Sequence, residues 1–415
     1  MSVKSNIQKI FRHRGTQLWL APVIGVFIAG ALAALMLFID AVADWGEAPP
    51  FPVFIGEANT ARDLLAVIAA SVTTLLALIF TIITVAIQLA SSQYSPRTLH
   101  ILLTDRPSHT TIGIFIGTFT YTLIVLLSLR TVTFQAQDSA QVAGVSMTGA
   151  FVIAVVSLGT FAIYSNHIIH SVRITSIINR ISTLTRQQII KYHPDQYHEN
   201  SEKSGDWQMS LTPQRVILSP KPGVFTNVNI DGLISAAQKT DCILVVIPPL
   251  GTFVPQGTPL IRVFGGEGPE HPEEHIILDT ERTLTRDIGY GIRQLVDIAT
   301  RALSTGINDP STAVQVIDQL HDLMRLLAWS RLPGDELSDE SGSVRLIVRT
   351  TAWEDSVHLA LEEIRLSGIS SLQVVRRLQG MLDELIENIP EDRIPPLQRQ
   401  RDLFLASIPQ KFKTS

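Results

Sequence analysis

The chain has 415 residues, of which 46% are hydrophobic and 17% are charged, and its formal net charge is −5. This length accommodates a membrane bundle together with one or two soluble domains, and the negative charge argues against a dedicated nucleic-acid-binding protein. The single cysteine, Cys242, excludes an internal disulfide, and its apolar surroundings predict a buried side chain.

Four apolar segments within the first 170 residues are long enough to cross a bilayer. They are Leu18–Ile39, Leu64–Leu89, Thr111–Leu129 and Val145–Tyr164. We therefore predict a four-helix transmembrane domain over residues 1–170. Small residues four positions apart in the first and third segments allow close helix packing, which is typical of membrane bundles.

The orientation follows from the basic residues in the short flanks. They gather in the N-terminal tail, in the second loop and after the fourth span, whereas the first and third loops hold one arginine each. Both termini are therefore predicted to be cytoplasmic. We expect the acids of the first loop to be solvated; these are Asp40, Asp44, Glu47, Glu57 and Asp63.

The second span carries a stripe of small and polar residues at every third or fourth position. Its members are Thr74, Ala77, Thr81, Thr84, Gln88, Ser91 and Ser95. On a helix these positions share one face. Because lipid offers no hydrogen-bond partner, this face must meet protein or water.

The stripe has two interpretations. In the first, like helices of a homo-oligomer surround a water path lined by Thr74, Thr81, Thr84, Gln88, Ser91 and Ser95, with Pro96 and Arg97 at its cytoplasmic mouth. In the second, the stripe serves ordinary helix packing, since threonine and serine hydroxyls can bond their own preceding carbonyls. The predicted spans contain no charged side chain, which argues against an ion-coupled transporter.

Residues 171–206 read as an amphipathic connector helix and a polar linker. The helix either packs on the soluble domain or lies on anionic lipid. Residues 207–266 then show short apolar runs separated by proline and glycine, which predicts a small β-barrel or sandwich module. Its turns look like those of lipoyl- or biotinyl-type modules, but a clear attachment lysine is absent from the sequence, so we expect a non-catalytic adaptor.

A helical pair is predicted over residues 279–332, followed by an α/β C-terminal unit over 343–390 and a flexible tail over 391–415. The fold class is thus a four-span α-helical membrane protein with a cytoplasmic α+β region. Between the paired helices, Asn308 and Asp309 form a possible ligand-binding turn. The alternative is an ordinary inter-helix turn in which Asp309 or Ser311 caps the second helix.

The run from His271 to His275 matches the letter pattern of one class of zinc peptidases. Those enzymes need both histidines on one helical face, and Pro272 opposes a regular helix there. The sequence shows neither a complete catalytic set nor a phosphate-binding loop. We therefore predict no enzymatic activity, no cofactor and no metal site.

Three phrases, at residues 91–97, 117–121 and 292–310, resemble a bacterial family of predicted multipass membrane proteins that is catalogued as a domain of unknown function. The resemblance spans most of the chain, and its most specific element is Gly-Ile-Asn-Asp-Pro at 306–310. It implies a protein of the bacterial inner membrane with a cytoplasmic C-terminal half.

The functional prediction is a homo-oligomeric, channel-like membrane protein that conducts ions and carries a cytoplasmic assembly or sensing domain. The alternative is a non-conducting scaffold in the same bilayer, whose cytoplasmic domain binds a partner or lipid. The two hypotheses differ in whether the stripe of the second span meets water.

Overall fold

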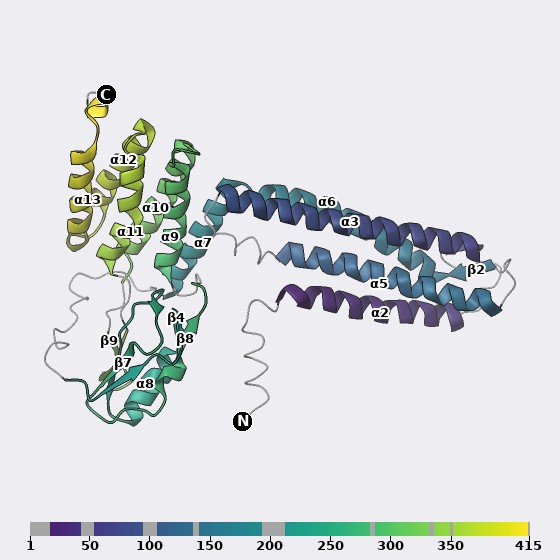
Figure 1. The fold of residues 1–415 in the computed structure, drawn as a ribbon, viewed down its shortest axis with the longest axis horizontal. Helices are drawn as coiled ribbons and strands as arrows, with labels where there is room; N and C mark the ends of the chain where they lie inside the picture. The colour runs from purple at the N-terminus through teal and green to yellow at the C-terminus, as the bar shows by residue number, and fades with distance from the viewer. Residues whose placement is uncertain are drawn as a thin grey trace. The chain divides into compact units, whose positions relative to one another are not determined.

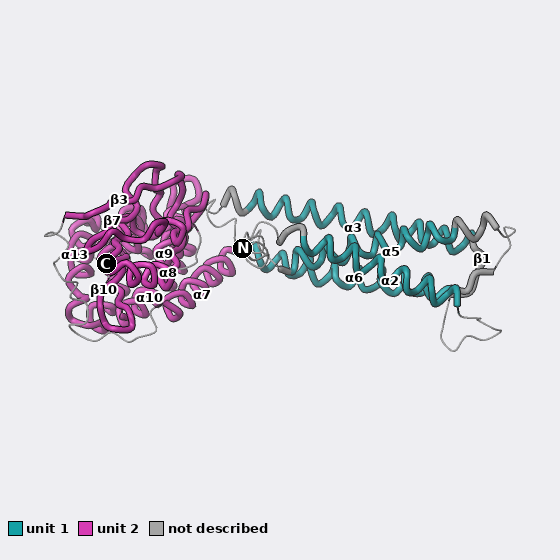
Figure 2. The backbone as a smooth tube through the Cα atoms, turned by 90° about the horizontal axis from the view of Figure 1, so that it is seen from below, with its two compact units in different colours: residues 1–173 teal, residues 174–415 magenta. Residues whose placement is uncertain are grey.

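The computed structural model describes residues 17–42, 54–93, 106–135, 141–192, 212–282, 287–331, 336–348 and 352–413. The chain forms two compact units, Met1–Arg173 and Ile174–Ser415 (Figure 2). Unit 1 contains the long apolar helices. Unit 2 contains the larger sheets and the remaining helices.

Four long helices run side by side in unit 1 (Figure 1). They are α2 (Gln17–Val42), α3 (Ala58–Gln93), α5 (Arg106–Gln135) and α6 (Val145–Ser171). Each contains a stretch with the length and composition of a membrane span: Leu20–Val42, Asn59–Leu89, Pro107–Leu129 and Val145–Ser171. The prediction of four apolar membrane helices is confirmed.

Two short strands join the loops that precede α3 and α6. Strand β1 (Phe54–Glu57) pairs antiparallel with β2 (Gln141–Gly144). Both loops therefore lie at the same end of the bundle, as the path of a chain that crosses the membrane four times requires.

Helices α2 and α5 approach so closely that their backbones touch. A Cβ atom added to Gly113 would lie 2.8 Å from the carbonyl oxygen of Ala21, and one added to Gly117 would lie 3.1 Å from that of Gly25. The residue numbers of the contacting positions increase together, from Ala21 with Gly113 to Gly25 with Gly117. Helices α2 and α5 therefore run in the same direction. Small residues provide this approach, as the sequence spacing predicted.

Polar side chains inside the bundle form hydrogen bonds between helices, with a side chain or a backbone carbonyl as the partner. The hydroxyls of Thr118 on α5 and Ser157 on α6 are 2.7 Å apart. The Tyr121 hydroxyl donates to the carbonyl oxygen of Ser146 at 2.9 Å. These bonds satisfy the polar groups of α5 and α6 where lipid would leave them without partners.

Asp40, near the end of α2, corrects one expectation. Instead of being merely solvated, its carboxylate accepts hydrogen bonds from the backbone N–H groups of Val145 at 2.6 Å and Ser146 at 3.0 Å. Those groups belong to the first turn of α6, whose own N-cap, Gly144, has no side chain to receive them. Asp40 thus caps a neighbouring helix.

Unit 2 contains a five-stranded and a three-stranded sheet. The larger has the order β3-β7-β5-β10-β9 and the smaller the order β6-β4-β8. The strands are β3 (Arg215–Leu218), β4 (Gly223–Val228), β5 (Ile243–Val246), β6 (Phe253–Val254), β7 (Pro259–Phe264), β8 (Ile276–Asp279), β9 (Glu336–Ser338) and β10 (Val344–Val348). Most neighbours pair antiparallel, but β10 pairs parallel with β5.

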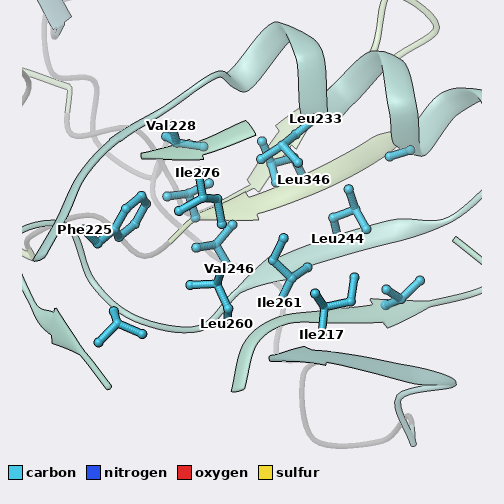
Figure 3. Packing of buried hydrophobic residues seen from close by; sticks show 14 of the residues in the cluster. Ile217, Phe225, Val228, Leu233, Leu244, Val246, Leu260, Ile261, Ile276 and Leu346 are labelled. Atoms are coloured by element: carbon cyan, nitrogen blue, oxygen red, sulfur yellow. The ribbon is translucent and has the colours of Figure 1, made fainter. Parts of the chain in front are cut away.

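One apolar core is shared by both sheets and by helix α8 (Ile230–Lys239) (Figure 3). It includes Phe225 from the smaller sheet, Leu244 from the larger sheet and Leu233 from the helix. The predicted barrel is not confirmed, because within the described residues neither strand order closes on itself. The predicted module over 207–266 also omits three strands of these sheets, which are β8, β9 and β10. The last of them, β10, begins about 80 residues beyond the end of β7.

The other end of unit 2 is helical (Figure 1). Its helices are α7 (Ile174–Tyr192), α9 (Ile288–Ala302), α10 (Pro310–Ala328), α11 (Trp353–Gly368), α12 (Leu372–Asn388), α13 (Ile394–Ser407) and α14 (Gln410–Lys413), with short 3-10 helices at Pro272–His275 and Glu391–Arg393. The apolar face of α7 packs on α9 and α10 within unit 2, and Ile178 and Ile181 are fully buried there.

The prediction of a flexible tail beyond residue 390 is wrong. Helix α13 packs on α11 and α12 and buries Leu397 and Phe404. The prolines Pro395 and Pro396 seemed to break any helix, but they lie in the first turn of α13. Backbone N–H groups of the first turn have no intrahelical partner, so proline is tolerated there.

Two glycines of α2 offer a matched test of the close approach. We expect Gly25→Ala to lower the thermal midpoint of unfolding, because its methyl group would overlap the backbone of Gly113 and overpacking costs about 1–3 kcal/mol. Gly30→Ala, whose methyl group would meet no atom within 4 Å, should leave the midpoint unchanged or raise it. Circular dichroism of the purified protein in detergent measures both, and equal midpoints would contradict the packing described.

Candidate functional site

The stripe of the second span lies on the outer side of α3. Thr74, Thr81 and Gln88 are exposed. Each of them comes two positions after a residue that is buried in the bundle, namely Val72, Ile79 and Ala86. Two positions on a helix correspond to about 200° of rotation. The stripe therefore points almost directly away from the helices that α3 packs against.

The stripe extends further toward the start of α3 than sequence reasoning predicted. Asp63, Ala66 and Ala70 are exposed and continue the spacing of three and four positions. We name the exposed set Asp63, Ala66, Ala70, Thr74, Ala77, Thr81, Thr84 and Gln88 the α3 polar face. The same spacing was present in the sequence, but Asp63 was assigned to the first loop instead of to the helix.

The threonines of the α3 polar face satisfy their hydroxyl protons within the helix. Thr74 donates to the carbonyl oxygen of Ala70 at 2.9 Å, Thr81 to that of Ala77 at 3.0 Å, and Thr84 to that of Phe80 at 2.8 Å. Each hydroxyl oxygen keeps its acceptor lone pairs on the exposed side. The threonines of the face therefore present oxygen acceptors, and the amide of Gln88 adds both an acceptor and donors.

Bulky apolar residues flank the α3 polar face. Val67 is 62% exposed, Leu78 is 44% exposed and Val85 is 55% exposed. These side chains suit lipid, whereas the face between them consists of narrow side chains along most of the span. Narrow side chains allow another helix to approach closely, and acceptor oxygens allow contact with water or cations.

The remaining predicted residues of the stripe are only partly placed. Ser91 lies in α3, near its end. Ser95, Pro96 and Arg97, predicted for the end and the mouth of a pore, lie outside the described residues. The face described above therefore ends at Gln88, one residue before the end of the apolar span.

The turn between α9 and α10 uses its polar groups locally. The two carboxylate oxygens of Asp309 accept from the backbone N–H of Thr312 at 3.2 Å and from its hydroxyl at 2.6 Å. Asp309, not Ser311, is thus the N-cap of α10. Asn308 adopts a left-handed backbone conformation with φ of 48°, which asparagine tolerates better than most residues. Asn308 and Asp309 are adjacent in this turn, and the carboxylate is engaged by Thr312.

The two histidines of the peptidase-like pattern have different neighbours. His271 Nδ1 lies 3.1 Å from Glu273 Oε1, and His275 Nδ1 lies 3.4 Å from Asn229 Nδ2. Residues Pro272–His275 form a 3-10 helix instead of the α-helix that a zinc peptidase needs. In the described part of the chain, no three His, Cys, Asp or Glu side chains converge as metal ligands.

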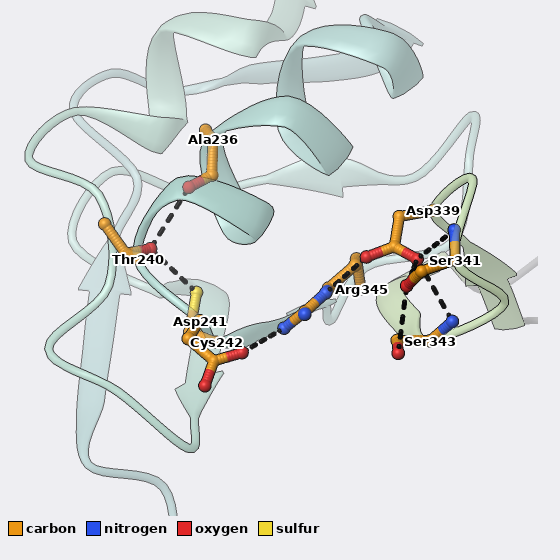
Figure 4. Close-up of polar contacts among 8 residues, drawn as sticks. All are labelled: Ala236, Thr240, Asp241, Cys242, Asp339, Ser341, Ser343 and Arg345. Atoms are coloured by element: carbon orange, nitrogen blue, oxygen red, sulfur yellow. Dashed lines mark hydrogen bonds and ion pairs between the residues drawn. The ribbon is translucent and has the colours of Figure 1, made fainter.

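Arg345 of β10 is the centre of a polar cluster at the edge of the larger sheet (Figure 4). Arg345 donates to Asp339 Oδ2 at 2.8 Å and to Asp241 Oδ1 at 2.7 Å. The other oxygen of Asp339 accepts from the backbone N–H groups of Ser341 and Ser343 at 3.0 and 3.1 Å. Hydrogen bonds from Arg345 and Ser341 lower the pKa of Asp339 to about 2.

Cys242, next to this cluster, is unsuited to nucleophilic chemistry. Its side chain is 1% exposed, and burial raises the pKa of the thiol. The thiol contacts the Thr240 hydroxyl at 3.3 Å. Because the reactive form of cysteine is the thiolate, this environment keeps Cys242 inert. The hydrogen bonds of Asp339 and Arg345 hold the β9–β10 turn on the sheet.

Comparison with known proteins gives a family and no solved structure. The model of the family described as "Predicted membrane protein (DUF2254)" matches residues 15–384. The uncharacterized protein Rv1290c of Mycobacterium tuberculosis and the uncharacterized protein Mb1321c of Mycobacterium bovis are each 27% identical over 405 residues, which is 95% of this chain and 76% of the relative. No solved structure matches the chain.

The Asp339 cluster predicts a pH-dependent contribution to stability. The pKa of Asp339 is lowered from 3.8 to about 2 on folding, so its stabilising effect is complete above about pH 5 and is lost progressively as the pH falls toward 2. We expect Asp339→Asn to lower the urea midpoint at pH 7, and the difference from wild type to shrink between pH 5 and pH 2.5. A difference that is independent of pH would contradict the assignment.

Proposed function

Because this chain belongs to the DUF2254 family of predicted membrane proteins, we propose a function from its own geometry. The chain forms a homo-oligomer in the membrane, and the α3 polar faces of identical copies surround a water-filled path that conducts ions. The soluble region of residues 174–415 serves assembly or sensing.

One observation carries this proposal: the α3 polar face is exposed on a helix that is otherwise long and apolar enough to span a membrane. The polar groups of α5 and α6 are used inside the bundle, at Thr118, Tyr121 and Ser157. The face of α3 has no such partner helix among the described residues. Self-association supplies one without requiring another protein.

The spacing of the face suits the packing of like helices around an axis. Asp63, Ala70, Ala77 and Thr84 are seven residues apart, and so are Thr74, Thr81 and Gln88. Two interleaved rows with a seven-residue repeat are the pattern that keeps one face of a helix toward its neighbours in a left-handed supercoil.

The chemistry of the face suits a path with weak charge selection. Between Ala66 and Thr84 it carries hydroxyl oxygens and methyl groups but no charged side chain. Hydroxyl acceptors can coordinate water and cations in passing. The only carboxylate of the face, Asp63, lies at the end of the span near β1, where it would attract cations to that mouth.

We place this assembly in the bacterial inner membrane with both termini in the cytoplasm. The support is the distribution of lysine and arginine, which favours the N-terminal tail and the region after the fourth span. The β1–β2 pairing agrees with this arrangement, because it brings the two arginine-poor loops to one end of the bundle.

The second candidate is a non-conducting scaffold, and the intrahelical hydrogen bonds of Thr74, Thr81 and Thr84 favour it. Because these hydroxyl protons are already satisfied, the face can also pack dry against another helix. In that case the soluble region binds a partner or lipid, and the membrane helices only hold the assembly.

Conductance tests the first candidate. The purified protein in planar bilayers should conduct ions, and Thr81→Val should change single-channel conductance by about fivefold, which corresponds to about 1 kcal/mol for one hydrogen bond. The control is Thr160→Val on α6, where the hydroxyl makes the same type of intrahelical bond, to Val156, but lies outside the α3 polar face. Intact oligomers without current would contradict the channel.

Cysteine accessibility separates the two candidates. Single cysteines at positions 74, 81 and 88 should react with a water-soluble maleimide in membranes, whereas cysteines at 64, 78 and 85 should be protected if the face lines a water path. The buried Cys242 contributes little background. Protection at all six positions would favour the scaffold.

A further inference from the structure

An apolar groove lies on the outer side of the bundle where α2, α5 and α6 meet. Its volume is about 380 Å³. Ile24, Ile28 and Leu32 of α2, Ile114 of α5 and Ile153 of α6 contribute bulky side chains to its lining. Gly25, Gly113 and Gly117 also line it, and their missing side chains leave the space open.

The lining is apolar because its hydroxyl groups bond elsewhere. The Thr118 hydroxyl is engaged by the Ile114 carbonyl oxygen at 2.9 Å and by Ser157 at 2.7 Å. The Tyr121 hydroxyl donates to the Ser146 carbonyl oxygen at 2.9 Å. What remains facing the groove is almost entirely hydrocarbon, so water would find few partners there.

The groove has the depth of one membrane leaflet. Its lining begins with Ala21 on α2 and Thr110 on α5, close to the starts of both spans, and ends at Leu32 and Tyr121. Eleven residues of helix rise about 16 Å, and half of the hydrocarbon core is about 15 Å. The groove thus extends from one membrane surface to near the bilayer centre.

We propose that this groove binds an acyl chain of a phospholipid from the leaflet in which α2 and α5 begin. The volume is more than ten times the roughly 30 Å³ that one water molecule occupies in the liquid, so an empty groove would deprive its lining of many contacts. At this depth the surrounding solvent is hydrocarbon. The hydroxyl of Thr110 lies at the headgroup end, where a lipid changes from apolar to polar.

The site is independent of the α3 polar face, since α3 contributes no residue to the groove. Loss of conduction would therefore leave this proposal intact, and loss of lipid binding would leave the oligomer intact.

Photo-crosslinking tests the proposal on the full-length protein. The probe is phosphatidylcholine with a diazirine in the acyl chain, added at one molecule per chain to protein in detergent. After illumination and digestion, adducts should concentrate on groove residues of α2, α5 and α6 instead of on the equally apolar exposed residues of α3. An even distribution over all four helices, or crosslinks that join two copies at the groove in place of lipid adducts, would overturn the proposal.

A pair of neighbouring substitutions on α6 supplies the control. Ile153→Trp places a large side chain in the groove, whereas Val152→Trp places it on the exposed side of the same helix. Ile153→Trp should reduce labelling by at least about tenfold. Binding of the acyl chain already weakens by this factor when two of its methylene groups are no longer buried. Equal labelling of both variants would overturn the proposal. Circular dichroism verifies that both remain folded.

Discussion

The absence of hydrogen-bond partners in hydrocarbon is the constraint on which the account of unit 1 depends. It explains why Thr118, Ser157 and Tyr121 bond across α5 and α6, and why Asp40 reaches the first turn of α6. The α3 polar face obeys the same constraint only in part. Its hydroxyl protons are satisfied within α3, but its small, oxygen-rich surface is not covered by the described helices of the same chain.

Unit 2 depends on a different interaction, the parallel pairing of β10 with β5. This pairing brings residues after α10 into the sheet that begins near residue 215, and it completes the core around Leu244 and Leu346. In the sequence, α9 and α10 therefore lie between two strands of the same sheet, β5 and β10. The separate β and helical ranges expected from the sequence meet in this single compact unit.

Local patterns in the sequence predicted the four spans, the small residues that allow close helix packing and an inter-helix turn with a cap at Asp309 or Ser311, because each pattern lies within a few turns of one segment. The pairing of α2 with α5 itself joins residues about 90 positions apart. The β5–β10 pairing depends on residues about 100 positions apart and leaves no local signal. Helix α13 was missed because its two prolines resemble a break, although they occupy the first turn, where proline is tolerated. The cap supplied by Asp40 was missed because its partners lie 105 and 106 residues away. The stripe was recognised, but its extension to Asp63 required the true start of α3.

The central claim is that the α3 polar face meets its counterparts in identical copies of the chain. An electron cryo-microscopy structure of the protein in lipid nanodiscs tests it most directly. We expect several copies around one axis, with Thr74, Thr81 and Gln88 of each α3 facing a hydrated centre. A single copy whose α3 polar face is surrounded by lipid, or copies that meet through α2 or α6 alone, would contradict it.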